Sequence, residues 1–375
     1  MTKLAIIGAS YLQLPLVRKA TEMGLETICF AWADGAVCKD ACTRFYPISI
    51  VEKEQILEVC RQEKVDGVTT IATDVAVPTI AFVAHEMGLV GNSLDCAFKA
   101  TNKYAMRQAL AAGGVRCPYF SLVHDKEEAA KALSNTTLPV IVKPCDRSGS
   151  MGVTKVERAE QLAEAVETAV SASFVKAAVL EKFVDIAQEI SVEGISWKGE
   201  HHVLAVTDKV TTGAPHYVEL GQHQPSQLPG EIIDEAVRQV KLGVKALGIE
   251  YGASHPELMV AKDGQVYVTE IGARMGGDFI GSDLVYLSTG YDFLKGVIEV
   301  ALGQFSRPEK RWAKCAGVWF YSPDTPRVKD IVNNRAAHPE ILRWEIHEDE
   351  LRPLTRSADR AGYFIYQGDR RLELT

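Results

Sequence analysis

Two glutamates that face each other across a predicted β-hairpin constrain this chain more than any other feature. Apolar runs flank Asp263-Gly264, a pair typical of a two-residue type I′ turn. Counting outward from that turn places Glu257 directly opposite Glu270, with Cβ atoms about 5 Å apart. Like charges so placed destabilise a strand pair unless a cation lies between them, and Mg²⁺ prefers carboxylate and phosphate oxygens. The pair predicts a divalent metal site; the alternative is a solvent-facing pair on an edge hairpin.

Composition limits the class of protein and its partners. The chain has 375 residues, enough for two or three modules, and its 47% hydrophobic and 24% charged residues are typical of a globular protein. A net charge of −8 without a basic block argues against nucleic acid or an anionic membrane as partner. No apolar run reaches the ~18 residues of a membrane span and a strand begins at Leu4, so we expect a cytoplasmic protein. The 8 cysteines form no CxxC pair, which indicates neither a zinc site nor a disulfide framework.

Residues 1–97 alternate between strand and helix patterns, which predicts a small parallel sheet of the Rossmann type. The loop Gly8-Ala9-Ser10 stands where a dinucleotide-binding fold carries GxGxxG, but the second and third glycines are missing. A structural turn is therefore expected there, and a nicotinamide-dependent dehydrogenase is disfavoured.

A second set of features predicts a phosphate site. Lys143 ends the buried strand pattern of residues 140–144, where a cation is costly without an anion. The glycine- and serine-rich turn of residues 145–153 follows, and its backbone N–H groups suit phosphate oxygens. No Gly-Lys-Ser/Thr completes a Walker pattern, so the cradle is of another kind.

Taken in order, these motifs resemble the ATP-grasp superfamily over about residues 1–305. The nearest types are the carboxylate-amine ligases, which include L-amino-acid ligases and the ATPase subunit of phosphoribosylaminoimidazole carboxylase. The resemblance implies a mixed α/β fold with four parts: a Rossmann-like pre-grasp domain (1–97), a linker helix and ATP-lid subdomain (98–180), an ATP-grasp catalytic domain (181–305) and a small β-rich region (306–375).

The resemblance also implies roles in ATP binding. Lys103 and Lys143 would contact the phosphates, under a lid formed by Ser148, Gly149, Ser150, Met151 and Gly152. Adenine would lie against the segment Glu181, Lys182, Phe183 and Val184, with Glu181 accepting from its amino group. Glu189 would bind the ribose hydroxyls, a role for which Asp185 and Glu193 are alternatives.

Metal binding and catalysis are implied further along the chain. Glu257 and Glu270 match the ligands of Mg²⁺, with two ions expected and Mn²⁺ as an alternative. Many members have Asn where this chain has Gly272, which removes a side-chain ligand of the second ion. Arg274 would stabilise the acyl phosphate and the tetrahedral intermediate, since its rigid planar fork suits such an anion; a structural salt bridge is the alternative.

Substrate residues are predicted in three places. The polar segment 209–223 reads as a loop between strands that suits a ligand lid. His255 lies on the same strand face as Glu257, and the residues after Arg274 are expected to begin a helix whose N-terminus suits a carboxylate. The candidates are Lys209, His216, Glu219, His255, Gly276 and Gly277.

The sequence therefore predicts an ATP-dependent ligase that activates a small carboxylate as an acyl phosphate and couples it to an amine, an amino acid being the expected acceptor. One alternative is a carboxylase or carbamoylating enzyme that phosphorylates bicarbonate. An alternative of another class is a non-catalytic nucleotide sensor or partner subunit. A homodimer and the role of residues 306–375 are left open.

Overall fold

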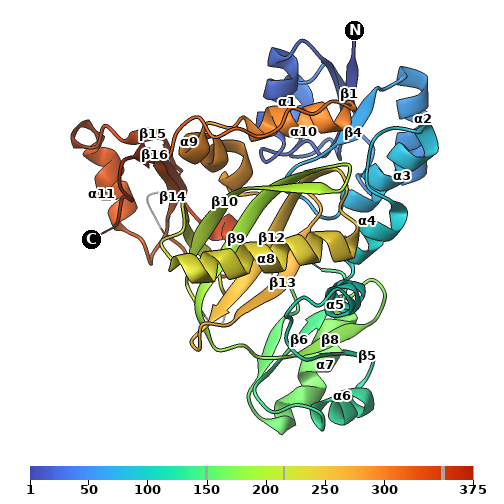
Figure 1. Ribbon diagram of the computed structural model, residues 1–375, viewed down its shortest axis with the longest axis vertical. Helices are drawn as coiled ribbons and strands as arrows, with labels where there is room; N and C mark the ends of the chain where they lie inside the picture. Colours follow the sequence, from blue (N-terminus) through green and yellow to red (C-terminus); the bar gives the residue numbers. More distant parts are fainter. Residues whose placement is uncertain (148–150, 214–215, 348–350, 375) are drawn as a thin grey trace.

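The computed structural model describes residues 1–147, 151–213, 216–347 and 351–374, which form three β-sheets surrounded by helices (Figure 1). The N-terminal sheet is parallel, with the order β3-β2-β1-β4. Its elements are β1 (Lys3–Ile7), α1 (Leu14–Glu22), β2 (Glu26–Phe30), β3 (Arg44–Tyr46), α2 (Lys53–Glu63), β4 (Gly67–Thr69) and α3 (Val77–Met87). Residues 4–7 are fully buried, as expected where helices cover both faces of a parallel sheet. The predicted Rossmann-like sheet is confirmed.

The loop after β1 is a structural turn. Gly8 has a φ of +112°, which favours glycine. The Gln13 side chain accepts hydrogen bonds from the backbone N–H of Ser10 at 3.1 Å and from its hydroxyl at 2.8 Å, and donates to the Ile71 carbonyl at 2.7 Å. The polar groups of this loop are thus used within the protein.

A small antiparallel sheet, β5-β8-β6-β7, follows the helices α4 (Leu94–Thr101) and α5 (Lys103–Ala112). Asn102 caps α5, because its side chain accepts from the Ala105 N–H at 2.9 Å. The strands are β5 (Phe120–Val123), β6 (Val140–Pro144), β7 (Thr154–Val156) and β8 (Ala178–Lys182), packed against α6 (Lys126–Leu133) and α7 (Leu162–Ala172).

The largest sheet has eight antiparallel strands in the order β13-β12-β9-β10-β11-β14-β16-β15. They are β9 (Ile186–Trp197), β10 (Glu200–Thr211), β11 (Glu219–Gln224), β12 (Gly252–Ala261), β13 (Val266–Gly272), β14 (Cys315–Tyr321), β15 (Ile341–Ile346) and β16 (Gly362–Gly368). Helix α8 (Gly230–Leu247) buries Val240, Val244 and Leu247 against β12 and β13, and crosses the sheet in Figure 1. The remaining helices are α9 (Val285–Thr289), α10 (Phe293–Ala301) and α11 (Arg327–Asn333).

The C-terminal region contributes three strands to this sheet. β14 pairs with β11 and with β16, and β16 pairs with β15. β14, β15 and β16 are thus continuous with the rest of this sheet through backbone hydrogen bonds. The domain boundaries given above stay a prediction.

The hairpin turn differs from the one predicted. The Ala261 N–H donates to the Gln265 carbonyl at 2.8 Å, so three residues, 262–264, form the loop. Only Gly264 among them has a positive φ, at +82°, whereas a type I′ turn needs two such residues. This change alone would shift the register by one residue and separate Glu257 from Glu270.

A β-bulge restores the predicted pair. Leu258 pairs with Val268, but the next pair is Glu257 with Glu270, so Thr269 is the extra residue. The Thr269 hydroxyl donates to the Glu257 carbonyl at 3.0 Å and holds the bulge. The two glutamates do lie opposite each other, although the reason given from the turn type was wrong.

None of the helices in the described part of the chain has the length and apolar character needed to cross a membrane.

Candidate active site

A cavity of about 310 Å³ lies between the small sheet and the β9–β13 part of the large sheet, and the loop after β4 closes one end. Most of the predicted site residues line it, although they come from eight different elements. These are Lys103, Lys143, Glu181, Lys182, Phe183, Val184, Glu189, Lys209, Glu219, His255, Glu257, Glu270 and Arg274.

Each of the two facing glutamates holds a lysine. Lys103, the first residue of α5, lies 2.6 Å from the Glu270 carboxylate. Glu257 binds Lys209 of β10 at 2.7 Å. Lys209 Nζ also lies 2.9 Å from Glu189, its partner in the β9–β10 pairing. The like charges of the hairpin are therefore each matched by a cation, as their position requires.

Burial and charge shift the pKa values of this cluster in opposite ways. Burial alone would lower the pKa of the Lys209 ammonium, but Glu257 and Glu189 outweigh it and raise that pKa well above its ordinary value. Burial raises the pKa of Glu257, yet Lys209 and His255 hold it well below the usual range. Lys209 was predicted to lie on a loop; it lies inside strand β10 and is 5% exposed. A lysine held by carboxylates in this way is a fixed part of the cavity.

A second group joins Lys143 to a buried carboxylate. Glu181 accepts from Lys143 at 2.7 Å through one oxygen and from Arg107 Nε at 2.7 Å through the other. Burial opposes its ionisation, but the two cations lower its pKa to about 2. Both carboxylate oxygens are thus engaged by the protein, and the predicted contact of Glu181 with the adenine amino group stays a prediction.

Arg107 was missed in the sequence. Its side chain is fully buried and also donates to the Thr269 carbonyl, at 2.6 Å, within the hairpin bulge. The available signal was its position one turn after Lys103, since residues four apart share a helix face.

Arg274 forms a bidentate ion pair with Asp74. Nε lies 2.8 Å from one carboxylate oxygen and Nη2 lies 2.7 Å from the other. Asp74 belongs to the loop after β4, which is attached to the catalytic strands by a hydrogen bond of 3.1 Å from the Ala72 N–H to the Met275 carbonyl. Asp74 was missed because it lies 200 residues from Arg274 in the sequence and no local pattern links the two.

This ion pair explains why the chain has Gly272. A Cβ at Gly272 would lie 3.0 Å from Asp74 Oδ1 and 3.1 Å from Arg274 Cζ. A larger residue would displace the pair, so the position at which many ATP-grasp proteins have Asn is filled by Asp74 and Arg274.

His255 links two carboxylates. Its Nδ1 lies 2.8 Å from Glu193, which is fully buried, and its Nε2 lies 3.4 Å from Glu257. Burial opposes its charge, but the two glutamates raise the pKa of His255 to about 9. Gly276 permits this contact, because a Cβ there would lie 2.7 Å from His255 Nδ1.

Among the remaining predicted residues, those that the structure describes do not line the cavity. Ser148, Gly149 and Ser150 lie outside the described residues; Met151 and His216 are exposed. Gly152 packs against Pro144 and Ala172, where a Cβ would lie within about 3.1 Å of either. Gly276 and Gly277 precede a short π-helix, Ile280–Leu284, so the helix begins later than predicted, and the carboxylate site at its N-terminus stays a prediction.

The described residues include no group of three or more His, Cys, Asp or Glu side chains arranged to hold a metal ion. The two carboxylates of Glu257 and Glu270 nonetheless fit a hard cation, since each already binds an ammonium group at 2.7 Å or less. Any metal at this pair would need further oxygen ligands from a bound molecule.

Comparison with known proteins supports the predicted fold. Residues 136–283 match the family model described as ATP-grasp domain. The crystal structure of L-amino acid ligase from Bacillus licheniformis superposes with a TM-score of 0.80 and 26% identity, covering 99% of this chain and 94% of that one. Phosphoribosylglycinamide synthetase from Anaerococcus prevotii has a TM-score of 0.78 at 21% identity, with 98% and 94% covered.

Curated relatives are similar over part of their length. Alanine–anticapsin ligase of Bacillus subtilis is 28% identical over 245 residues, which is 60% of this chain and 51% of the relative. The carbamoyl phosphate synthase large chain of Neisseria meningitidis is 28% identical over 261 residues, which is 68% of this chain and 24% of the relative. This chain thus has the ATP-grasp fold, as predicted, and spans about half or less of these two proteins.

Proposed function

We propose that this ATP-grasp chain is an ATP-dependent ligase that joins a small carboxylate to an amine by way of an acyl phosphate. The observation that carries the proposal is the arrangement of Glu257 and Glu270, opposite each other and each beside a lysine, in a cavity that also contains Arg274. The similarity to alanine–anticapsin ligase and to an L-amino acid ligase supports an amino acid as the amine.

Lys103 and Lys143 would bind the phosphates of ATP. Both ammonium groups line the cavity and are largely buried, so they are positioned before a nucleotide arrives. The backbone of residues 182–184 would contact adenine, and Glu189 the ribose. The segment that includes Ser148–Ser150 is proposed as the lid.

Glu257 and Glu270 would hold magnesium, which supplies charge neutralisation at the β- and γ-phosphates when it is bound. Lys103 would then be free to turn from Glu270 toward a phosphate oxygen, since the carboxylate no longer depends on it for neutralisation. Lys209 would keep Glu257 ionised and would hold Glu189 in place.

The reaction proceeds in two transfers. A carboxylate oxygen of the acid attacks the γ-phosphorus of ATP, and the bond between that phosphorus and the ADP oxygen breaks. The amine nitrogen then attacks the acyl carbon, the bond from this carbon to the phosphate oxygen breaks, and the nitrogen loses a proton as the amide forms. Arg274 would stabilise the oxyanion of the tetrahedral intermediate, with Asp74 holding its guanidinium in the required plane.

A panel of substrates tests the proposal. ADP and phosphate release should require both an amino acid and a second carboxylate, and the Glu270→Gln variant should show none. Release of ADP and phosphate with bicarbonate and no amino acid would favour the carboxylase or carbamoylating alternative. The similarity to the carbamoyl phosphate synthase large chain supports that alternative. ATP binding without release under all of these conditions would favour the nucleotide-sensor alternative.

A further inference from the structure

The eight-stranded sheet has an open edge in its interior, along the first half of β10. β11 pairs with β10 only from Asp208 to Thr211, and the Ser226 N–H reaches the Val206 carbonyl at 2.9 Å. Residues 200–203 and Ala205 pair with β9 on one side, and Leu204 between them is a bulge. On their other side, no backbone hydrogen bond joins them to any described residue. Such an edge is a template for another strand.

Two adjoining cavities follow this edge. One has a volume of about 460 Å³ and is lined by residues 200–204; the other, of about 370 Å³, is lined by residues 203–206. They share Val203, Leu204, Thr289 and Lys310, so they form one continuous depression, which we call the β10 groove. Its opposite wall consists of Thr289 and residues 307–315, the segment that leads into β14.

The β10 groove lies in line with β11, because Pro225 and Ser226, which follow that strand directly, line it. In the sheet order, β11 alone separates β10 from β14, and neighbouring strands lie ~4.8 Å apart. Where β11 ends, the segment before β14 bonds to the end of α9 instead, since the Arg311 and Lys314 N–H groups donate to the Thr289 and Ser288 carbonyls at 2.8 and 3.0 Å. The two cavities lie between this wall and β10. Six unpaired residues at ~3.3 Å each accommodate a strand of about five to seven residues.

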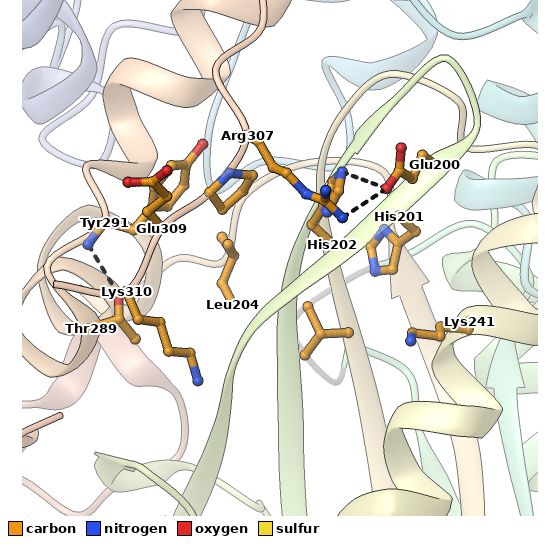
Figure 2. A pocket seen from close by; sticks show the side chains of 12 residues that line it. Glu200, His201, His202, Leu204, Lys241, Thr289, Tyr291, Arg307, Glu309 and Lys310 are labelled. Atoms are coloured by element: carbon orange, nitrogen blue, oxygen red, sulfur yellow. Dashed lines mark hydrogen bonds and ion pairs between the residues drawn. The ribbon is translucent and has the colours of Figure 1, made fainter. Parts of the chain in front are cut away.

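One end of the groove has a small excess of positive charge, because Lys241, Arg307 and Lys310 line it together with Glu200 and Glu309. Glu200 is already engaged by Arg307 at 3.4 Å and by His202 at 3.5 Å, and Figure 2 shows both side chains directed at its carboxylate. Lys241 of α8 and Lys310 are exposed, and no described residue forms an ion pair with either. In Figure 2, Lys310 lies beside Thr289 on the wall opposite β10.

The other end of the groove is apolar. Ile233 and Val237 of α8 line it, together with Val206 and Trp312. A strand in this row would alternate its side chains between the two faces of the sheet, so one set would face α8.

We propose that the β10 groove binds an extended acidic peptide segment of a partner protein, which adds to the sheet as a strand beside β10. Main-chain hydrogen bonds to the open edge would supply affinity, and side-chain contacts would supply specificity. Acidic side chains pair with Lys241 and Lys310, and apolar side chains pack on Ile233 and Val237. No residue of the groove lines the active-site cavity, so this site is separate from the proposed ligase activity.

Selection from a displayed library of random heptapeptides on the immobilised full chain tests the proposal. We expect enriched peptides that carry Asp or Glu together with apolar residues, and a fluorescein-labelled synthetic copy of one should bind in solution. The double variant Lys241→Glu, Lys310→Glu should bind it at least tenfold more weakly. Lys245→Glu is the matched control: this lysine is exposed on α8 one turn after Lys241 and lines neither cavity, so binding should stay within twofold.

Amide hydrogen exchange locates the bound peptide. Residues 200–206 should gain protection when the peptide is added. The proposal is overturned if no acidic peptide is enriched, if protection appears elsewhere, or if the double variant binds normally. It is also overturned if N-acetylglutamate competes as well as the peptide, which indicates a small-anion site, or if protein concentration alone protects residues 200–206, which indicates a second copy of the chain.

Discussion

Replacing Arg274 by alanine separates a catalytic from a structural role for this residue. Its guanidinium forms two hydrogen bonds of 2.8 and 2.7 Å to Asp74, and the side chains of the pair are 15% and 16% exposed. If Arg274 stabilises the intermediate, its loss should lower kcat roughly 100-fold or more, about 3 kcal/mol of barrier, while ATP affinity stays within a few-fold.

The same change should also destabilise the fold. Asp74 would keep a buried charge without its partner, and breaking such a pair costs about 3–5 kcal/mol. We expect roughly 3 kcal/mol, the low end of that range, because water still reaches part of both side chains. Urea unfolding of the two proteins measures this difference.

Two further variants complete the experiment. Asp74→Asn keeps the guanidinium but removes its carboxylate partner, so kcat should fall less than tenfold. Arg274→Lys should restore little activity, because a point charge does not reproduce the planar two-pronged contact. Steady-state kinetics and direct nucleotide binding are measured for each. The reasoning is refuted if Arg274→Ala weakens ATP binding a hundredfold with kcat intact, or if Asp74→Asn is as inactive as Arg274→Ala.

Three other predictions follow from the structure. Glu270→Gln should abolish turnover but leave magnesium-independent nucleotide binding intact. If the variant keeps more than about a tenth of the activity, the activation barrier has risen by less than ~1.4 kcal/mol, which contradicts the metal assignment. Burial lowers the pKa of His201 to about 4 and that of His223 to about 3, so below pH 6.5 the unfolded chain binds protons that the folded chain does not. The free energy of unfolding should therefore fall as pH decreases from 6.5 to 5, by at most ~1.4 kcal/mol per pH unit for each histidine. Urea unfolding at several pH values measures this slope for the wild type and for His201→Asn, and equal slopes would disprove the prediction. Gly276→Ala should destabilise the protein by about 1–3 kcal/mol, because its Cβ would lie 2.7 Å from His255 Nδ1; an unchanged unfolding midpoint would show that His255 moves at no cost.

The predicted metal pair shows what local sequence patterns can and cannot predict. Strand character and proximity of Glu257 and Glu270 followed from alternating residues and an Asp-Gly turn. The turn type was nevertheless wrong, and the register is right only because the Thr269 bulge offsets the three-residue loop. The bulge is held by the Thr269 hydroxyl within the hairpin and by Arg107 of α5, and the hairpin sequence by itself does not contain the second contact.

The sequence by itself determined the parallel N-terminal sheet, the turn at Gly8 and most of the residues that line the cavity. Each of these features depends on residues close in the chain, or on a motif order shared with similar proteins, so it can be predicted without knowing how the sheets pack. Only the tertiary structure decided that Asp74 holds Arg274, that Lys209 lies buried among glutamates, that the C-terminal strands extend the catalytic sheet and that β10 has an open edge. These contacts join segments far apart in sequence, and which partners meet depends on how the sheets pack, because many other pairings satisfy the same local patterns.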